Sequence, residues 1–306
     1  MLKFFGKKFI FLSITLFIVT TLTFILMTAI PGDPFSDEKA LPKEVHLALR
    51  KHYGLEEPLY VQYFKYVRSV FTWNLGPSLQ YPDRTVNEII QECFPISALL
   101  GIQALLLSMT IGAFLGVYAA IKHDQWQSFT TLLCACIGIS IPSFILAAFL
   151  QYLLAIKAGF FPVARWGSFS QTILPALSLA AMPMASITRL VRANMLEVLR
   201  SDYIKTAASK GLSPTQIIFK HALKNSLAPL LPYFGQLSAN ILLGSFIIEK
   251  IYGIPGLGQW FVNSVNNRDY TMIMGSTVFY SFVLLFLLFL ADMIHCALDP
   301  RIKRNS

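Results

Sequence analysis

The polar side chains best placed to do chemistry in this sequence are uncharged groups inside long apolar segments. Tyr233, Gln236 and Asn240 recur at i, i+3 and i+7, which places them on one face of a helix. A hydroxyl and two amides on one face can hydrogen-bond to a neighbouring helix or to a polar solute that passes beside it. The spacing leaves both interpretations open, so the three residues are candidates for lining a pathway.

Two further apolar segments carry similar groups. Ser276 and Tyr280 belong to a cluster of hydroxyls close to the C-terminus and are weaker pathway candidates. Ser140 and Ser143 flank Pro142 in a third segment. Hydrogen bonding between helices explains these residues about as well as a pathway does.

Groups that could perform catalysis or hold a cofactor are missing. The sequence has no phosphate-binding Gly-x-x-x-x-Gly-Lys-Ser/Thr loop, no His-Glu-x-x-His metal motif and no Gly-x-Ser-x-Gly nucleophile elbow. Its four cysteines lack metal or redox spacing. We therefore expect no catalytic, metal or cofactor residue and no enzyme activity. If the chain performs work, a partner supplies the energy.

The amino-acid composition indicates whether these side chains lie in a soluble protein or in a membrane. Hydrophobic residues make up 55% of the 306 residues, Phe alone occurs 25 times, and only 13% are charged, against about 25% charged in a typical soluble domain. A soluble protein of this size could not bury so much apolar surface. The composition excludes a disordered chain, a disulfide-rich secreted protein and an ordinary cytosolic enzyme, and it predicts an all-α polytopic membrane protein.

Six segments are long and apolar enough to cross a bilayer, which takes roughly 20 residues each. The first is uncharged and stops at a Pro-Gly-Asp-Pro turn, so we expect a retained span rather than a cleaved signal peptide. In the second, Ala104, Ser108, Gly112, Gly116 and Ala120 form a small-residue face that favours close helix packing. The six predicted spans are 9–30, 96–121, 130–156, 173–191, 227–248 and 271–298.

The positive charges set the predicted orientation. Basic residues are enriched in short cytoplasmic loops, whereas long loops cross largely regardless of charge. With both termini in the cytoplasm, and the long loop 31–95 excluded, 14 basic residues lie inside and 4 outside. The net charge of +9 is therefore attributed to topology rather than to nucleic-acid binding.

The extracytoplasmic segment 31–95 carries helix signals. A first helix is predicted over Lys43–Tyr53, with Gly54 as its stop signal. In a second helix, four apolar residues share one face: Tyr60, Phe64, Val67 and Phe71. Thr85 and Glu88 then form a capping-box pattern, which precedes a further apolar stripe. Two interpretations remain open. The short helices pack on the membrane helices, or they form a docking surface for an extracytoplasmic partner.

The longest cytoplasmic segment, 192–226, is predicted to hold two short helices with a sharp joint. Gly211 suits the position after a helix C-terminus, and Ser213 with Pro214 suits the start of the next helix. Such a segment makes a rigid protrusion at the membrane surface. The alternative is an amphipathic connector with a solvated basic face.

This cytoplasmic segment resembles the coupling loop of ATP-binding-cassette (ABC) importer permeases, in the dipeptide, oligopeptide and nickel transport family. Ala207, Gly211 and Leu223 fit the general loop pattern. Lys205 and Thr206 stand where that pattern has Glu and Ala, and Lys224 where it has Pro. These departures are usual within this family, so they narrow the assignment. The resemblance implies that the coupling loop contacts the ATPases through Asp202, Tyr203, Lys205, Thr206, Ala207, Gly211 and Leu223.

The resemblance extends over nearly the whole chain. Each short string is weak alone, but seven in the right order are specific. They are Pro31-Gly32-Asp33-Pro34, Tyr53-Gly54-Leu55, Pro58-Leu59-Tyr60-Val61-Gln62-Tyr63, Leu75-Gly76, Ser140-Ile141-Pro142-Ser143-Phe144, Pro255-Gly256-Leu257-Gly258 with Arg268-Asp269-Tyr270, and Leu298-Asp299-Pro300-Arg301.

The resemblance implies a first permease subunit of the oligopeptide type, with six transmembrane helices in the type I importer fold, in a bacterial inner membrane. The implied partners are a second homologous permease subunit, two cytoplasmic ATPases and an extracytoplasmic substrate-binding protein, with no nucleic acid. The expected parts of the chain are a first transmembrane helix at 1–30, the extracytoplasmic segment 31–95, a permease core at 96–298 with coupling loop 192–226, and a cytoplasmic tail at 299–306.

Two rivals remain at this stage. A nickel permease of the same family is not well separated from a peptide permease by sequence. An ion-coupled secondary transporter would work without ATPases, and such carriers usually hold a carboxylate near the middle of a span. No predicted span has one there, which favours the ATP-driven importer.

Overall fold

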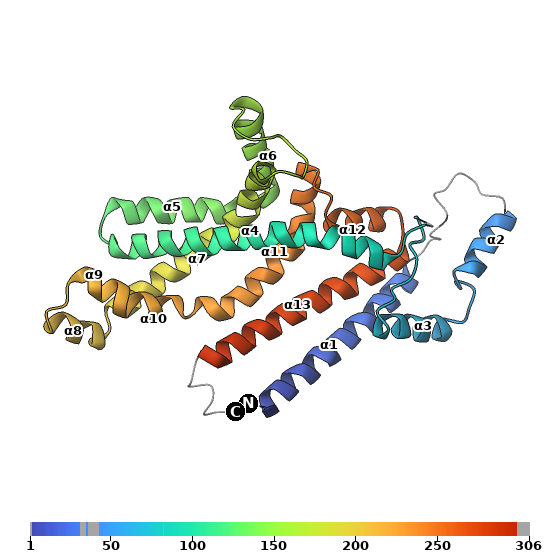
Figure 1. Ribbon diagram of the computed structural model, residues 1–306, viewed down its shortest axis with the longest axis horizontal. Coiled ribbons are helices and arrows are strands. Elements are labelled where there is room, and N and C mark those ends of the chain that lie inside the picture. The colour runs from blue at the N-terminus through green and yellow to red at the C-terminus, as the bar shows by residue number, and fades with distance from the viewer. Residues whose placement is uncertain (1, 31–34, 36–42, 82, 299–306) are drawn as a thin grey trace. The chain divides into compact units, whose positions relative to one another are not determined.

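The computed structural model describes residues 2–30, 35, 43–81 and 83–298, with some side chains excepted. It contains helices and no strand among these residues. Contacts divide the chain into two compact units: unit 1 holds residues up to Ile96 together with Gly256–Phe289, and unit 2 holds Ser97–Pro255 and the end of the last helix (Figure 1). The predicted division into four parts stays a prediction.

Unit 1 contains α1 (Leu2–Ala29), α2 (Lys43–His52), α3 (Leu59–Phe71), the start of α4 (Val86–Ile121), α12 (Leu257–Asn266) and most of α13 (Tyr270–Leu298). Unit 2 contains the rest of α4, α5 (Trp126–Ser140), α6 (Ser143–Leu150), the π-helix η1 (Gln151–Lys157), α7 (Phe169–Leu199), α8 (Asp202–Ser209), α9 (Pro214–Gln216), the π-helix η2 (Ile217–Ala222), α10 (Leu223–Leu227) and α11 (Leu230–Tyr252).

Within the described residues, four helices are long and apolar enough to cross a membrane, namely α1, α4, α7 and α13, or five if a bent pair forms one span. The predicted fifth span coincides with α11, which is not among them. The count of six therefore remains a prediction, while the all-α membrane architecture is confirmed.

The bent pair lies where the sequence predicts one span, at 130–156. The structure breaks this segment into α5, which ends at Ser140, and α6 with η1, which begin at Ser143 and run at an angle of 105° to α5. Ile141 is extended and Pro142 caps α6. Proline lacks an amide proton and pushes the residue before it out of helical geometry, which accounts for the break.

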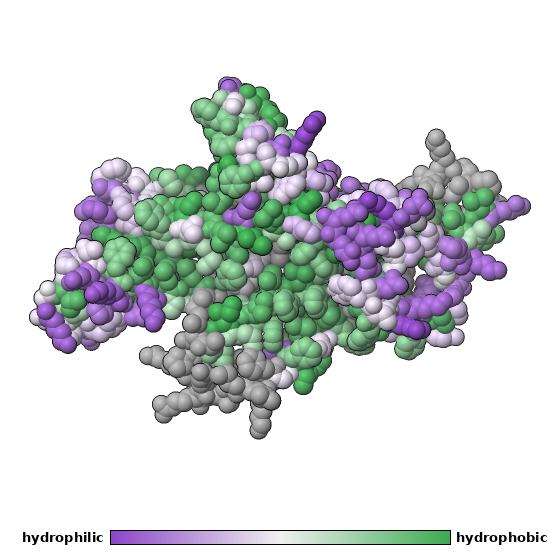
Figure 2. Space-filling view, viewed as in Figure 1, coloured by the Kyte–Doolittle hydropathy of each residue, from purple (hydrophilic) through white to green (hydrophobic). Residues whose placement is uncertain are grey.

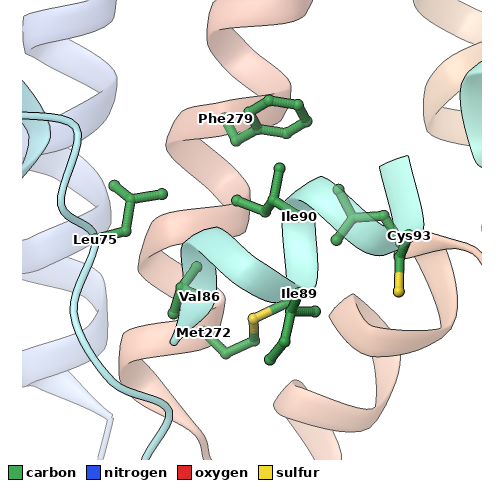
Figure 3. Close-up of a cluster of buried hydrophobic side chains, with 8 residues drawn as sticks. Leu75, Val86, Ile89, Ile90, Cys93, Met272 and Phe279 are labelled. Carbon is green, nitrogen blue, oxygen red and sulfur yellow. The ribbon is translucent and has the colours of Figure 1, made fainter. Parts of the chain in front are cut away.

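The core of unit 1 joins the start of α4 to α13. Val86, Ile89 and Ile90, members of the predicted stripe, are buried against Met272 and Phe279 (Figure 3). The predicted capping box is confirmed at this helix start. The Thr85 amide donates to the Glu88 carboxylate at 2.9 Å, and the Glu88 amide donates to the Thr85 hydroxyl at 3.2 Å.

α2 and α3 are present as predicted, but three residues of the predicted apolar face of α3 are exposed. Tyr60 and Phe64 are each 67% exposed and Phe71 is 79% exposed. No residue of α3 is buried. α3 itself contacts the membrane-spanning helix α1, where the Tyr63 ring lies edge-on to Phe24, so both interpretations of this segment stay open.

The core of unit 2 forms around α7, which packs against α5, α6 and α11. The small-residue face of α4 approaches α7 closely, as the sequence predicts. A Cβ atom added to Gly112 would lie 2.8 Å from the Met184 carbonyl oxygen, and one on Gly116 would lie 2.7 Å from the Thr188 carbonyl oxygen. These two glycines set the separation between the helices.

Candidate functional site

The coupling loop, residues 192–226, has the predicted joint between two helices. α8 ends at Ser209, Lys210 caps it, and Gly211 follows with φ of 81°. Positive φ is the left-handed conformation that glycine adopts at little cost. A Cβ atom at Gly211 would meet nothing within 4 Å, so the constraint at this position is conformational rather than steric.

The second helix of the loop begins as predicted. Ser213 is the N-cap and Pro214 the first helical residue. The Gln216 amide donates to the Ser213 hydroxyl, and the Ser213 amide donates to the Gln216 side chain, which completes a capping box. After α9 the chain continues as the π-helix η2 and then as α10. The sequence analysis does not predict the π-helix.

A buried cluster, here called the loop core, holds the protrusion in place. Ile204 and Ala207 of α8 pack with Ile217 and Ala222 of η2. The same cluster includes Ala120 at the end of α4 and Met195 in α7, both fully buried. The loop core therefore joins α8 and η2 to two long helices, α4 and α7.

The outer surface of the loop is polar. Asp202, Lys205 and Thr206 are exposed, and the Lys205 ammonium pairs with the Asp202 carboxylate at 2.8 Å. The hydroxyl of Tyr203, which is 43% exposed, accepts from the Asn225 side chain at 2.8 Å and so links α8 to α10. Hydrophilic residues gather over this α8–α9 end of unit 2 (Figure 2).

Two of the predicted contact residues are not on this outer surface. Ala207 is only 7% exposed and belongs to the loop core, so it offers little surface to a partner, and its predicted ATPase contact stays a prediction. It shares its helical face with Ile204, which turns toward α4 and α7 rather than outward. Leu223 is half-buried. Gly211, by contrast, lies on the exposed joint.

This burial gives a prediction. Ala207→Asp places a carboxylate among apolar side chains without a partner, which is strongly unfavourable. We expect a lower apparent melting temperature of the purified protein and a disordered loop that chymotrypsin cleaves faster. Ala208→Asp, at the exposed neighbouring position, is the matched control and should retain the wild-type values. Equal melting temperatures for the two variants would contradict the burial of Ala207.

The structure separates the candidate pathway residues between the two units. In unit 2, Tyr233 is half-buried and Gln236 is exposed, and the side chain of Asn240 lies outside the described part of the structure. In unit 1, Ser276 is fully buried and donates to the Met272 carbonyl oxygen at 2.5 Å. Tyr280 is half-buried and its ring lies edge-on to Phe261. Ser276 thus offers no surface to a solute, while Gln236 does.

A buried carboxylate in unit 2 was not singled out by sequence. Glu249 in the last turn of α11 is fully buried and accepts from the Ser97 hydroxyl at 2.7 Å. Nearby in the sequence, the Tyr252 hydroxyl donates to the Ala147 carbonyl oxygen at 3.0 Å and lies 3.2 Å from the Ser178 hydroxyl. These bonds hold α4, α6, α7 and α11 together.

A second buried carboxylate, Asp269, organises unit 1. It precedes α13 and accepts from the Met272 amide at 3.0 Å, as an N-cap does. It also accepts from the Ser78 hydroxyl and from the Leu79 amide. An Asp directly before an apolar run is an N-cap signal that could have revealed this role. Burial, and secondarily the Asp269 charge, raises the pKa of Tyr53.

No group of three or more metal-binding side chains occurs within the described residues.

Comparison with known protein families identifies the family to which this chain belongs. The model of the binding-protein-dependent transport system inner membrane component matches residues 112–304, and the N-terminal model of the same transport component matches residues 1–100. The chain belongs to this family of transport permeases. It is accordingly a multi-pass inner membrane protein.

Relatives align over the full length of this permease. It is 46% identical over 306 residues to the dipeptide transport system permease protein DppB of Bacillus subtilis, covering 100% of this chain and 99% of that protein. It is 40% identical over 305 residues to the oligopeptide transport system permease protein OppB of Salmonella typhimurium, covering 99% and 100% respectively.

Solved structures share the fold. The inward-facing MetNI methionine ABC transporter matches with a TM-score of 0.57 at 20% identity, over 69% of this permease and 96% of that chain. An amino acid ABC transporter solved with histidines gives a TM-score of 0.52 at 16% identity, over 69% and 94%. The ABC permease fold expected from the sequence is thereby confirmed.

Proposed function

We propose that this permease is one subunit of an ATP-driven peptide importer and forms half of the membrane pathway. The observation that carries the proposal is the 46% identity over the entire chain to a dipeptide permease. The oligopeptide permease at 40% identity supports the same substrate class. Dipeptides and oligopeptides share neutral peptide amides and charged termini, to which an exposed amide such as that of Gln236 is able to hydrogen-bond.

The proposed complex contains a second homologous permease subunit, cytoplasmic ATPases and an extracytoplasmic substrate-binding protein. The coupling loop is the proposed ATPase contact, through the exposed residues Asp202, Tyr203, Lys205 and Thr206 and the joint at Gly211. The loop core supports this role, because it packs the protrusion against the ends of α4 and α7. Closure of the ATPases then reaches the spans through these contacts.

The experiment that tests the function is reconstituted uptake. The permease is co-expressed with the second permease, ATPases and binding protein of its own gene cluster and placed in proteoliposomes. We expect ATP-dependent accumulation of a radiolabelled dipeptide. Accumulation of nickel in place of the dipeptide would refute the peptide assignment, and uptake without ATPases would refute the importer class.

The same assay tests the proposed pathway role of Gln236. Gln236→Leu removes an exposed amide without adding bulk, so we expect a lower maximal uptake rate with an unchanged subunit composition. Gln125→Leu is the matched control, because it makes the same replacement at an exposed site outside both α11 and the coupling loop, and it should retain the wild-type uptake rate. Unchanged uptake by Gln236→Leu would assign this residue to helix packing.

The proposed topology places both termini in the cytoplasm and 31–95 outside. In a variant without the four native cysteines, Asp83→Cys should react with a membrane-impermeant maleimide on intact cells, because Asp83 is exposed. Ser209→Cys, equally exposed in the coupling loop, should react only after the membrane is permeabilised. Labelling of Ser209→Cys on intact cells would reverse the proposed orientation.

A further inference from the structure

α3, which the proposed function does not use, carries a row of exposed aromatic side chains. Tyr60, Phe64 and Phe71 are all exposed. They recur at i, i+4 and i+11, so they share one side of the helix and are here called the aromatic stripe. A row of large exposed aromatic side chains marks a surface that contacts an apolar partner.

The side of α3 away from the aromatic stripe lines a pocket of about 470 Å3 in unit 1. Gln62, Lys65 and Tyr66 line this pocket, and helical spacing places them away from the stripe. The Gln62 amide donates to the Leu55 and Glu57 carbonyl oxygens, and the Lys65 ammonium pairs with the Glu57 carboxylate. α3 is therefore amphipathic, with polar contacts on one side and the stripe on the other.

The first half of α3 is attached to α1. The Tyr63 and Thr21 hydroxyl oxygens lie 2.9 Å apart, and the Tyr63 ring lies edge-on to Phe24. Thr21 precedes the end of α1 at Ala29 by eight residues, which is about 12 Å along the helix. α1 is of membrane-spanning length and composition, and the hydrocarbon core of a bilayer is about 30 Å thick. The attachment therefore lies below the end of the span, at the level of the acyl chains of one leaflet.

A second attachment lies just beyond the other end of α3. The Trp73 ring centroid lies 6.2 Å from that of Phe279 and 5.7 Å from that of Phe282. These two residues follow the start of α13 at Tyr270 by nine and twelve positions, which is about 14 and 18 Å along the helix. Met27 near the end of α1 and Tyr270 line the same pocket, so both depths are measured from the same side of the membrane.

Two attachments at similar depths mean that α3 runs roughly along the membrane plane rather than across it. The pocket lies at the ends of the two spans, so the aromatic stripe, on the side away from the pocket, faces the acyl chains. Arg68 is exposed beside the stripe, where a long basic side chain reaches back toward the headgroups. Trp73 is 44% exposed, and Trp is enriched at the membrane interface.

We propose that α3 is an interfacial helix, which lies in the membrane plane and places the aromatic stripe among the acyl chains of the outer leaflet. The leaflet follows from the proposed topology, in which 31–95 is extracytoplasmic. An aromatic side with basic residues beside it is typical of such helices. The stripe also continues the apolar surface of α1, where Ile25 and Leu26 are more than half exposed. This membrane contact does not depend on the transported substrate.

Fluorescence quenching in vesicles tests this contact. In a variant without the four native cysteines, Phe64→Cys is labelled with the fluorophore NBD. The full-length permease is reconstituted with its second permease in phosphatidylcholine vesicles. The quenchers are phosphatidylcholine with a doxyl group near the top of one acyl chain, and iodide in the water. We expect the label to lose most of its fluorescence to the doxyl lipid and little to iodide.

Two further labels complete the test. Phe71→Cys should show the same quenching as Phe64→Cys, because α3 lies in the membrane plane. Both residues are exposed, so neither replacement removes a buried contact. Lys65→Cys is the matched control, because Lys65 is exposed on the pocket side of the same helix. Its label should be quenched by iodide and little by the doxyl lipid.

Three results would overturn the proposal. Quenching of the Phe64 label by iodide and not by the doxyl lipid would mean that the aromatic stripe faces water or a soluble partner. Protection of this label from both quenchers would assign the stripe to the contact with the second permease. Quenching of the Phe64 label by the doxyl lipid with quenching of the Phe71 label by iodide alone would mean that α3 does not lie in the membrane plane.

Discussion

Gly211→Val should abolish substrate-stimulated ATP hydrolysis while the permease still inserts and still pairs with its sister subunit. The backbone at Gly211 has φ of 81°, a conformation that costs a residue with a Cβ atom roughly 1–2 kcal/mol and a β-branched residue more. The joint between α8 and α9 must therefore re-form, and the proposed ATPase surface changes shape. ATPase stimulation and co-purification of the ATPases measure the effect.

Two variants separate this local effect from general destabilisation. Gly159 also has positive φ, at 66°, and open space around its Cβ position, but it follows η1, outside the coupling loop. Gly159→Val should retain coupling. Gly211→Asn should retain more coupling than Gly211→Val, because Asn tolerates the left-handed conformation. Wild-type stimulation and a normal ATPase complement in Gly211→Val would refute the docking assignment.

A substitution of Lys205 is expected to reduce ATPase stimulation less than a substitution of Gly211. Its ion pair with Asp202 joins two side chains that are 68% and 95% exposed, and exposed pairs contribute about 0–1 kcal/mol. The loop is held instead by the buried contacts of Ile204 and Ala207 with η2, α4 and α7. Coupling should therefore depend on backbone geometry and packing more than on the surface charges.

Local signals in the sequence predicted local structure well. Gly211, Ser213 and the Thr85–Glu88 pair each act within a few residues, through backbone conformation or a capping hydrogen bond, so their neighbours in the chain suffice to identify them. The broken helix at Pro142 had a local signal too, but the apolar composition on both sides concealed it. Hydropathy measures length and polarity and does not report a bend.

Long-range partners could not be predicted from the same signals. Helical periodicity places Ala207 and Ile204 on one face but does not say whether that face meets solvent, an ATPase or α4 and α7. For the same reason Ser276 was a pathway candidate, although its hydroxyl is bonded to its own helix. The buried Glu249 acquires its role only from Ser97, a residue 152 positions earlier in the chain.

The contact between α4 and α7 is the one long-range feature that the sequence predicted in part. A small-residue face predicts that another helix packs closely against it, although it does not say which helix. Gly116→Ala should destabilise the permease, because the added Cβ atom would lie 2.7 Å from the Thr188 carbonyl oxygen and from the Val191 Cβ atom. Neither atom can move without shifting α7. Overpacking of this kind typically costs about 1–3 kcal/mol, and Gly112→Ala, at 2.8 Å from the Met184 carbonyl oxygen, should behave in the same way.

Gly138→Ala, in contrast, should leave the stability of the permease unchanged or raise it. A Cβ atom there would lie 3.4 Å from the Ala185 Cβ atom, an ordinary contact, and Ala favours a helix over Gly by about 1 kcal/mol. We expect the apparent melting temperature of the detergent-solubilised protein to fall by several degrees in Gly116→Ala and Gly112→Ala and to stay level or rise in Gly138→Ala. Three equal melting temperatures would show that α4 and α7 are not in backbone contact in the folded permease.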